Sequence, residues 1–170
     1  MPGIFANAGF PTDQITVLNA VVALLQASVS ALAGDNLCFL SMHTDPIENY
    51  RQNIYATVAP MSGRYDEDLF RGSGNAVEQS GVIVTVFSQM RLDRPDADTR
   101  MLTDETRGLL TLKKQILKAL NAKQLQDGEG NNILTSVMRP INAGHPGRAS
   151  EEMGTFSLAF ATDFLWNLSS

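Results

Sequence analysis

The residue types that most often carry chemistry are few in this chain and form no recognised arrangement. The two histidines, His43 and His145, lie about a hundred positions apart, and the acidic residues near His43 do not complete a zinc-ligand spacing. The single cysteine, Cys38, stands between Leu37 and Phe39, an apolar setting in which a thiol is normally inert. We therefore predict surface histidines and a buried, unreactive cysteine.

Glycine-rich and acidic segments also lack the residues that would make them sites. The segment 127–132 begins like a calcium-binding loop, but Asn132 and Met138 stand where glycine and glutamate are needed. Residues 72–74 (GSG) lack the lysine of a phosphate-binding loop, and no serine has the Gly-x-Ser-x-Gly context of a hydrolase nucleophile. The sequence predicts no catalytic residue, metal or cofactor, and we expect no enzymatic activity.

Composition favours one acidic globular domain. The chain has 170 residues, 44% of them hydrophobic and 18% charged, which suits one folded domain of ordinary size. Its formal net charge of −5 argues against a nucleic-acid reader, which needs clustered lysine and arginine. The longest apolar stretch, 17–32, is interrupted by polar residues and is too short to cross a bilayer. We expect no membrane association.

Two amphipathic helices are predicted. Apolar residues recur every three or four positions over 15–32, with a start at Thr12 or Asp13 and a stop at Gly34. A second helix is predicted over about 104–122, with Thr103 as its N-cap. The predicted buried positions are Ile15, Leu18, Val22, Leu25, Val29 and Leu32 in the first helix, and Leu109, Leu112, Ile116, Leu117 and Leu120 in the second.

Five strands are predicted, over 37–42, 53–59, 81–90, 133–138 and 155–166. The last has the cleanest alternation, with Phe156, Leu158 and Phe160 on one face and small or polar residues on the other. Helices do not alternate regularly with strands, so we predict an α+β fold, an antiparallel β-sheet packed by two main α-helices with long inter-strand loops. The expected organisation is an N-terminal arm at 1–11 and a single domain at 12–170.

The predicted loops are long for so small a sheet. About twenty residues separate Ala59 from Gly81, and a second loop is predicted over 139–154. Connections of this length are usually functional or disordered. The first loop mixes aromatic, arginine and acidic side chains, which suits a protein–protein contact. The candidate interface residues are Arg64, Tyr65, Asp66, Glu67, Asp68, Leu69, Phe70 and Arg71.

The chain resembles the tail terminator (tail-completion) proteins of long-tailed bacteriophages and related tail-like particles. The resemblance covers most of 12–168 and includes the amphipathic first helix, the loop 63–72 (GRYDEDLFRG), the strand 81–88 (GVIVTVFS), the helix 102–114 (LTDETRGLLTLKK) and the closing strand 155–166. It carries over no catalytic residue and no individual interface position.

The resemblance implies a structural virion protein assembled in the host cytoplasm. Such subunits form a homo-oligomeric ring, typically a hexamer, at the tail–head junction. The ring caps the head-proximal end of the tail tube and meets the head–tail connector proteins. DNA passes through the lumen without specific binding, which suits an acidic chain because like charges repel.

Two alternatives remain open from the sequence. Another neck or head–tail connector protein, or a tail-tube subunit, would share the helix-on-sheet layout. A small ligand-binding or enzymatic α+β domain would need converging polar groups in a pocket, and no such constellation is evident in the sequence.

Overall fold

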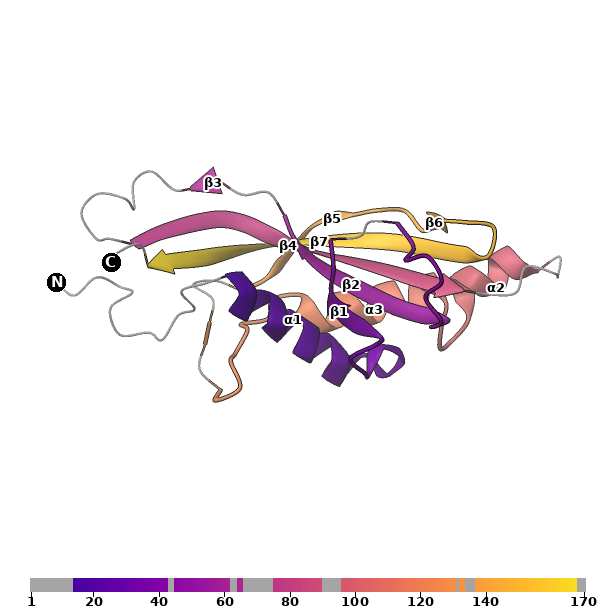
Figure 1. Cartoon of the computed structure of the whole chain (residues 1–170), viewed down its shortest axis with the longest axis horizontal. Coiled ribbons are helices and arrows are strands. Elements are labelled where there is room, and N and C mark those ends of the chain that lie inside the picture. Colours follow the sequence, from indigo (N-terminus) through magenta and orange to yellow (C-terminus); the bar gives the residue numbers. More distant parts are fainter. Residues whose placement is uncertain are drawn as a thin grey trace.

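A computed structural model describes residues 14–42, 45–61, 64–65, 75–89, 96–130, 132–133 and 137–167, with the backbone alone at 64–65, 75–80 and 163–167. These residues form a seven-stranded sheet whose main path runs β1-β2-β4-β7-β5, while β3 pairs with β4 and β6 pairs with β7. Three α-helices and one short 3-10 helix accompany the sheet in this part of the chain (Figure 1). The predicted α+β class is confirmed.

The sheet is antiparallel except at one edge, where β1 runs parallel to β2. The strands are β1 (Cys38–Leu40), β2 (Ile54–Pro60), β3 (Arg64–Tyr65), β4 (Asn75–Gln89), β5 (Arg139–Ala143), β6 (Gly147–Arg148) and β7 (Met153–Asn167). The helices are α1 (Gln14–Ser28), the 3-10 helix η1 (Ser30–Leu32), α2 (Ala97–Thr103) and α3 (Leu109–Leu120).

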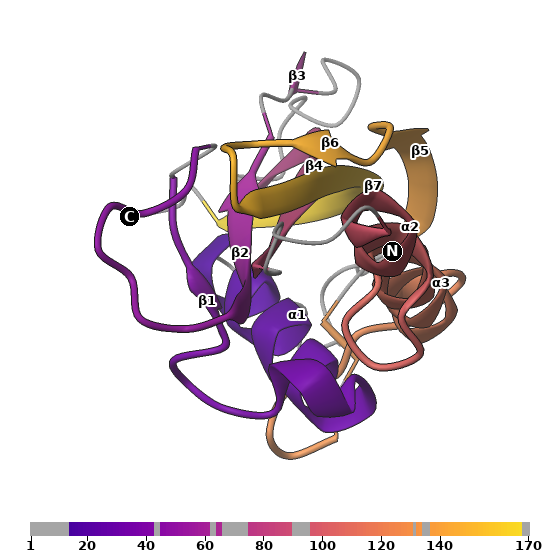
Figure 2. The same ribbon diagram turned by 90° about the vertical axis from the view of Figure 1, so that its right-hand side faces the viewer.

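The core lies between one face of the sheet and two of the helices. Alternate residues of β4 and β7 are buried on this face and are paired across the strands, as in Val82↔Phe160 and Val84↔Leu158. Figure 2 shows α1 and α3 on the same side of the sheet. They contribute the buried residues Val17, Val21 and Leu25 from α1 and Leu112, Ile116 and Leu120 from α3.

The first helix is correct in place but shifted in face and length. Ile15 is 63% exposed and Val21 is buried, whereas the predicted Val22 is half-buried. The α-helix ends at Ser28 because Val29 adopts an extended backbone, and η1 replaces the last predicted turns before Gly34. Leu18, Leu25, Val29 and Leu32 are buried as predicted.

The second predicted helix, 104–122, begins later than predicted, because α3 begins at Leu109. Thr103 is the last residue of a separate helix, α2, that was not predicted, rather than an N-cap. The Asp104 side chain causes the break, since its Oδ1 accepts hydrogen bonds from the backbone N–H of Thr106 (2.9 Å) and of Arg107 (2.8 Å). These bonds stabilise a tight turn in place of a continuous helix. On α3 the predicted face is confirmed except at Leu117, which is partly buried.

Three strand predictions need correction. β4 begins at Asn75, so the last part of the predicted 60–80 loop is strand. The predicted strand 133–138 is wrong at its described residues, because Ile133 and Met138 lie outside any strand and 134–136 lie outside the described residues. β5 and β6 instead lie within the predicted 139–154 loop. All five residues of β5 are exposed, so it has no apolar alternation to reveal it.

Gly154 allows α2 and α3 to approach the sheet closely. A β-carbon at this position of β7 would overlap the Sδ of Met101 in α2 and come within 2.8 Å of Cδ1 of Leu109 in α3. The absence of a side chain at position 154 therefore makes room for Met101 and Leu109 against β7.

We predict that Asp104→Ala lowers the free energy of unfolding by about 1 kcal/mol at neutral pH, because the turn loses its hydrogen-bond acceptor. The N–H groups of Arg107 and Thr106 lower the pKa of Asp104. Because the folded-state pKa is depressed, this stabilisation is present near neutral pH and is lost as the pH falls through that pKa. Urea unfolding should therefore show the gap between wild type and variant shrinking between about pH 7 and about pH 3.

Glu105→Ala is the matched control for Asp104→Ala, since Glu105 is the adjacent exposed carboxylate. Its effect should be small at both pH values. A gap for Asp104→Ala that stays constant with pH would contradict the role given to the Asp104 carboxylate.

Candidate assembly surfaces

The longest feature of the molecule is a two-stranded ribbon formed by β4 and β7. The two strands pair at fifteen positions, from Asn75↔Asn167 to Gln89↔Met153. β2 accompanies β4 only from Val82 onward, so the outer parts of the ribbon, 75–81 and 161–167, continue beyond the end of β2. At about 3.3 Å per residue these outer seven pairs extend roughly 20 Å. Figure 1 shows the ribbon reaching past α1, which gives the chain an arm for contacts.

The predicted interface loop begins on this ribbon. The backbone N–H of Met61 donates to the carbonyl oxygen of Gly81 (2.9 Å), and β3 then pairs with β4 through Arg64↔Gln79 and Tyr65↔Glu78. β3 therefore continues the line of β2 along the same edge of β4. The remaining candidate residues lie outside the described residues: Asp66, Glu67, Asp68, Leu69, Phe70 and Arg71.

Gly81 lies at the point where the outer part of the ribbon, 75–81 and 161–167, begins. A β-carbon there would overlap the carbonyl oxygen of Phe160 and come within 2.9 Å of the Met61 Sδ. The backbones of β4 and β7 therefore lie unusually close together at Gly81, where β2 ends. A residue without a side chain is needed at this position.

The face of the sheet turned away from the helices is uncharged at its described side chains on β2, β4 and β7. It carries short hydroxyl and alanine side chains, and the hydroxyl oxygens of Thr85 and Ser157 lie 2.9 Å apart in a hydrogen bond. The Thr155 hydroxyl donates to the carbonyl oxygen of Val86 (2.8 Å), which satisfies another polar group on this face. None of these side chains carries the positive charge that attracts phosphate groups most strongly.

At the end of the sheet farther from the ribbon, this face carries an aromatic cluster. The rings of Tyr55 and Phe87 stack with centroids 4.8 Å apart, and the Tyr50 ring meets Tyr55 edge-on at 4.7 Å. The backbone N–H of Ile47 donates to the Tyr55 hydroxyl (2.9 Å), and the Tyr50 hydroxyl donates to the carbonyl oxygen of Asn36. Burial raises the pKa of both tyrosines. The cluster thus holds the chain that follows β1 against the sheet.

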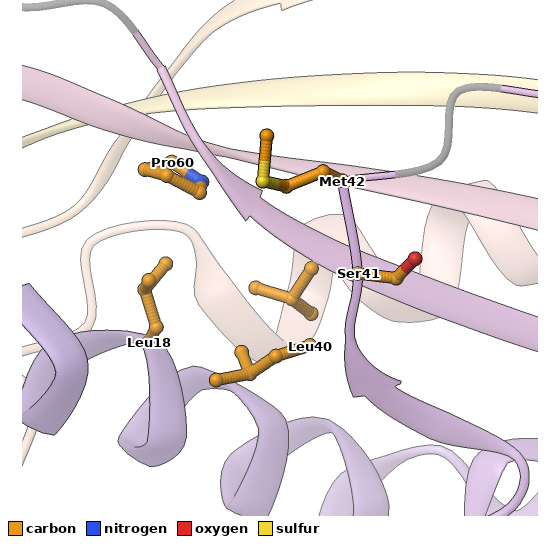
Figure 3. A pocket seen from close by; sticks show the side chains of 6 residues that line it. Leu18, Leu40, Ser41, Met42 and Pro60 are labelled. Carbon is orange, nitrogen blue, oxygen red and sulfur yellow. The ribbon is translucent and has the colours of Figure 1, made fainter.

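An apolar groove of about 500 Å³ lies beside the β1 edge. Figure 3 shows Leu18 of α1, Leu40, Met42 and Pro60 around this hollow, while the Ser41 hydroxyl points away from it. Leu40 is 41% exposed and Met42 is 89% exposed. Sequence reasoning missed this groove, because its residues come from three separate segments and none carries a motif.

The opposite edge strand, β5, carries an exposed apolar residue of its own. Its register against β7 shifts between Pro140 and Asn142, which makes Ile141 the extra residue of a β-bulge. The Ile141 side chain is 54% exposed. Figure 2 shows β1 and β5 at opposite sides of the sheet.

The residues considered for chemistry are not brought together. Cys38 is buried as predicted, and burial raises the pKa of its thiol to about 12. His145 is exposed as predicted, and His43 lies outside the described residues. Among the described residues no group of three His, Cys, Asp or Glu side chains could hold a metal ion. The described helices include none that is long and apolar enough to cross a membrane.

The fold is similar to that of a solved virion component. One chain from the virion of a native gene transfer agent particle superimposes with a TM-score of 0.57 at 16% identity, over 87% of this chain and 93% of that chain. A chain from an extracellular contractile injection system, in a structure of the sheath/tube terminator in its extended state, gives a TM-score of 0.48 at 13% identity, over 93% of this chain and 57% of that chain. No protein-family model matches the chain, and no curated protein matches it in sequence.

We predict that Gly81→Ala lowers the free energy of unfolding by about 1–3 kcal/mol, because the added methyl group forces β4 away from β7. Urea unfolding followed by circular dichroism measures this change. Gly147→Ala is the control, since a β-carbon there meets nothing within 4 Å, and it should change stability by less than about 0.5 kcal/mol. Equal effects of the two substitutions would contradict the close approach of β4 and β7 at Gly81.

Proposed function

We propose that this protein is a structural component of a phage-tail-like particle, the tail terminator that caps the head-proximal end of the tail tube. In this proposal six copies form a closed ring that stops tube growth and meets the connector proteins of the head. The protein works by contact rather than by catalysis. Its place is the virion, at the junction of tail and head.

The observation that carries the proposal is the fold similarity to a chain of a gene transfer agent virion, which extends over nearly the full length of both chains. Two features of the described residues agree with it. The ribbon of β4 and β7 extends beyond the core as a contact arm, and the sheet has two edges, β1 and β5, at opposite sides. A subunit with two different contact edges suits a head-to-tail ring.

Passage of DNA through such a ring requires surfaces that do not hold phosphate. The sheet face turned away from the helices has no lysine or arginine among its described side chains on β2, β4 and β7, and it carries the exposed Arg139 at its β5 edge, opposite Ala161. The net charge of −5 adds a weak general repulsion of DNA. We propose that this face looks toward the lumen, where DNA would slide past hydroxyl and alanine side chains.

The segment 64–71 is the proposed contact with the tube or with the adjacent subunit. Its first two residues run along the ribbon as β3, so the segment starts on the arm that projects from the core. Its aromatic and arginine residues are of the types that dominate the binding energy of protein interfaces.

We predict that deletion of the gene yields particles with overlong tails that are not joined to DNA-filled heads, because nothing stops tube growth. Electron microscopy of negatively stained lysates measures tail length and head attachment. Supplying the intact chain in trans is the control and should restore tails of uniform length. Supplying a chain in which 64–71 is replaced by a Gly/Ser linker should give a folded protein that does not restore them.

Other outcomes assign other roles. Tails of normal length beside unjoined heads would place the protein among the neck proteins on the head side. Loss of all tubes would make it a tube subunit. Unchanged particles would contradict a role in the tail altogether.

A further inference from the structure

The groove beside β1 is where exposed apolar side chains gather. Six large apolar side chains are exposed among the described residues, and three of them lie at or beside this groove. Leu40 and Met42 line it, and Ile15 lies one helical turn before Leu18, which lines it from α1. Removal of such side chains from water is favourable, so the groove suits an apolar occupant.

The groove lies at the beginning of α1. Leu18 comes four residues after Gln14, the first residue of the helix, so the helix starts about 6 Å along its axis from the groove. Figure 3 shows Leu18 on one side of the hollow, with Pro60 and Met42 on the other. Residues 1–13 lie outside the described residues and join α1 at Gln14. The segment that precedes the helix is therefore attached within about one turn of the groove.

Phe10 is close enough in the chain to reach this groove. Four residues separate it from Gln14, and four extended residues span at most about 14 Å. This span exceeds the single turn of helix between Gln14 and Leu18. Pockets of about 300–1,000 Å³ hold small-molecule ligands, so the groove of about 500 Å³ has room for an aromatic ring.

The composition of the segment matches that of the groove. Residues 1–12 include no charged side chain, and their large apolar residues include Ile4, Phe5 and Phe10. The side chains that line the groove are also uncharged, and the Ser41 hydroxyl points away from the hollow (Figure 3). Contact between the two therefore takes no charged side chain out of water.

We propose that the groove beside β1 binds the N-terminal segment of the same chain, with the Phe10 ring inserted between Leu18, Met42 and Pro60. A short tether gives the segment an effective concentration in the millimolar range, so at micromolar protein the contact within one copy wins over the same contact between copies. The segment then covers an apolar surface that would otherwise bring free copies together non-specifically. This inference concerns a single copy and does not depend on the proposed function.

Disulfide trapping tests the contact directly. A purified full-length chain with Phe10→Cys and Met42→Cys is oxidised mildly at low protein concentration, and the products are separated on a non-reducing gel and identified by mass spectrometry. The expected product is a monomer with an internal disulfide. The native Cys38 does not compete, because it is buried and its pKa is raised to about 12.

The matched control for trapping is a chain with Phe10→Cys and Ile141→Cys. Ile141 is exposed on β5, at the opposite side of the sheet from β1 (Figure 2). This chain should stay reduced under the same conditions. An internal disulfide that forms equally well in both double variants would show a segment without a fixed site and would overturn the proposal.

The reactivity of a thiol at position 42 measures the cover without a second introduced cysteine. In a full-length Met42→Cys chain, addition of Phe10→Ser should raise the rate of reaction with a thiol reagent about tenfold, because the ring no longer holds the segment over the groove. Ala8→Ser is the control, since it alters the same segment without removing a large apolar side chain, and it should leave the rate unchanged. Equal rates with and without Phe10→Ser would overturn the proposal.

A mixture of separate Phe10→Cys and Met42→Cys chains tests the competing occupant. A disulfide-linked dimer from this mixture, with no internal disulfide in the double variant, would assign the groove to the segment of a second copy and overturn the contact within one chain. The tails seen on gene deletion test the terminator alone, since trapping and labelling use the purified chain. Failure of either proposal therefore leaves the other standing.

Discussion

The fifteen-residue ladder between β4 and β7 is the interaction on which the rest of this structure depends. Each strand spans the whole length of the sheet, and every other strand attaches to this pair directly or through β2. Its central part supplies Val82, Val84 and Phe160 to the core against which α1 and α3 pack. Its outer part supplies the arm, so the same hydrogen-bonded ladder links the stability of the core to the proposed contact surface.

The helices α1 and α3 pack on one face of the sheet, and the other face has a different composition. Apolar stripes on α1 and α3 bury the branched and aromatic side chains of one parity of the sheet. The other parity of β7 carries short hydroxyl and alanine residues. The hydroxyl groups of Ser157 and Thr155 form hydrogen bonds with the Thr85 hydroxyl and the Val86 carbonyl oxygen of β4. Sheets that bury one face commonly present the second face to solvent or a partner. A wall of this kind suits the lumen of a ring in the proposed function.

The sequence predicted the elements whose own residues show their period. The face of α3, the strand through Val82–Val86 and the alternation of β7 were all predicted from apolar spacing. The first six residues of β4 were missed because 75–80 is mostly polar and forms strand through pairing with β7 and β3. β5 was missed because all its residues are exposed. The break between α2 and α3 depends on the hydrogen bonds of a single aspartate, which helical spacing does not reveal.

The surface features could be found only from the fold. The groove is formed by Leu18, Met42 and Pro60, which come from distant segments, and the bulge shows only in the register of β5 against β7. Of the predicted interface, only the backbone of Arg64 and Tyr65 is placed, and its role stays a prediction.

The most direct test of the central claim is the location of this chain in the assembled particle. Cryo-electron microscopy of intact particles should show one ring of this fold at the head-proximal end of the tail tube. In that ring the sheet face turned away from the helices should line the lumen. Copies repeated along the whole tube, or density for the chain at the distal end of the tail, would contradict the account.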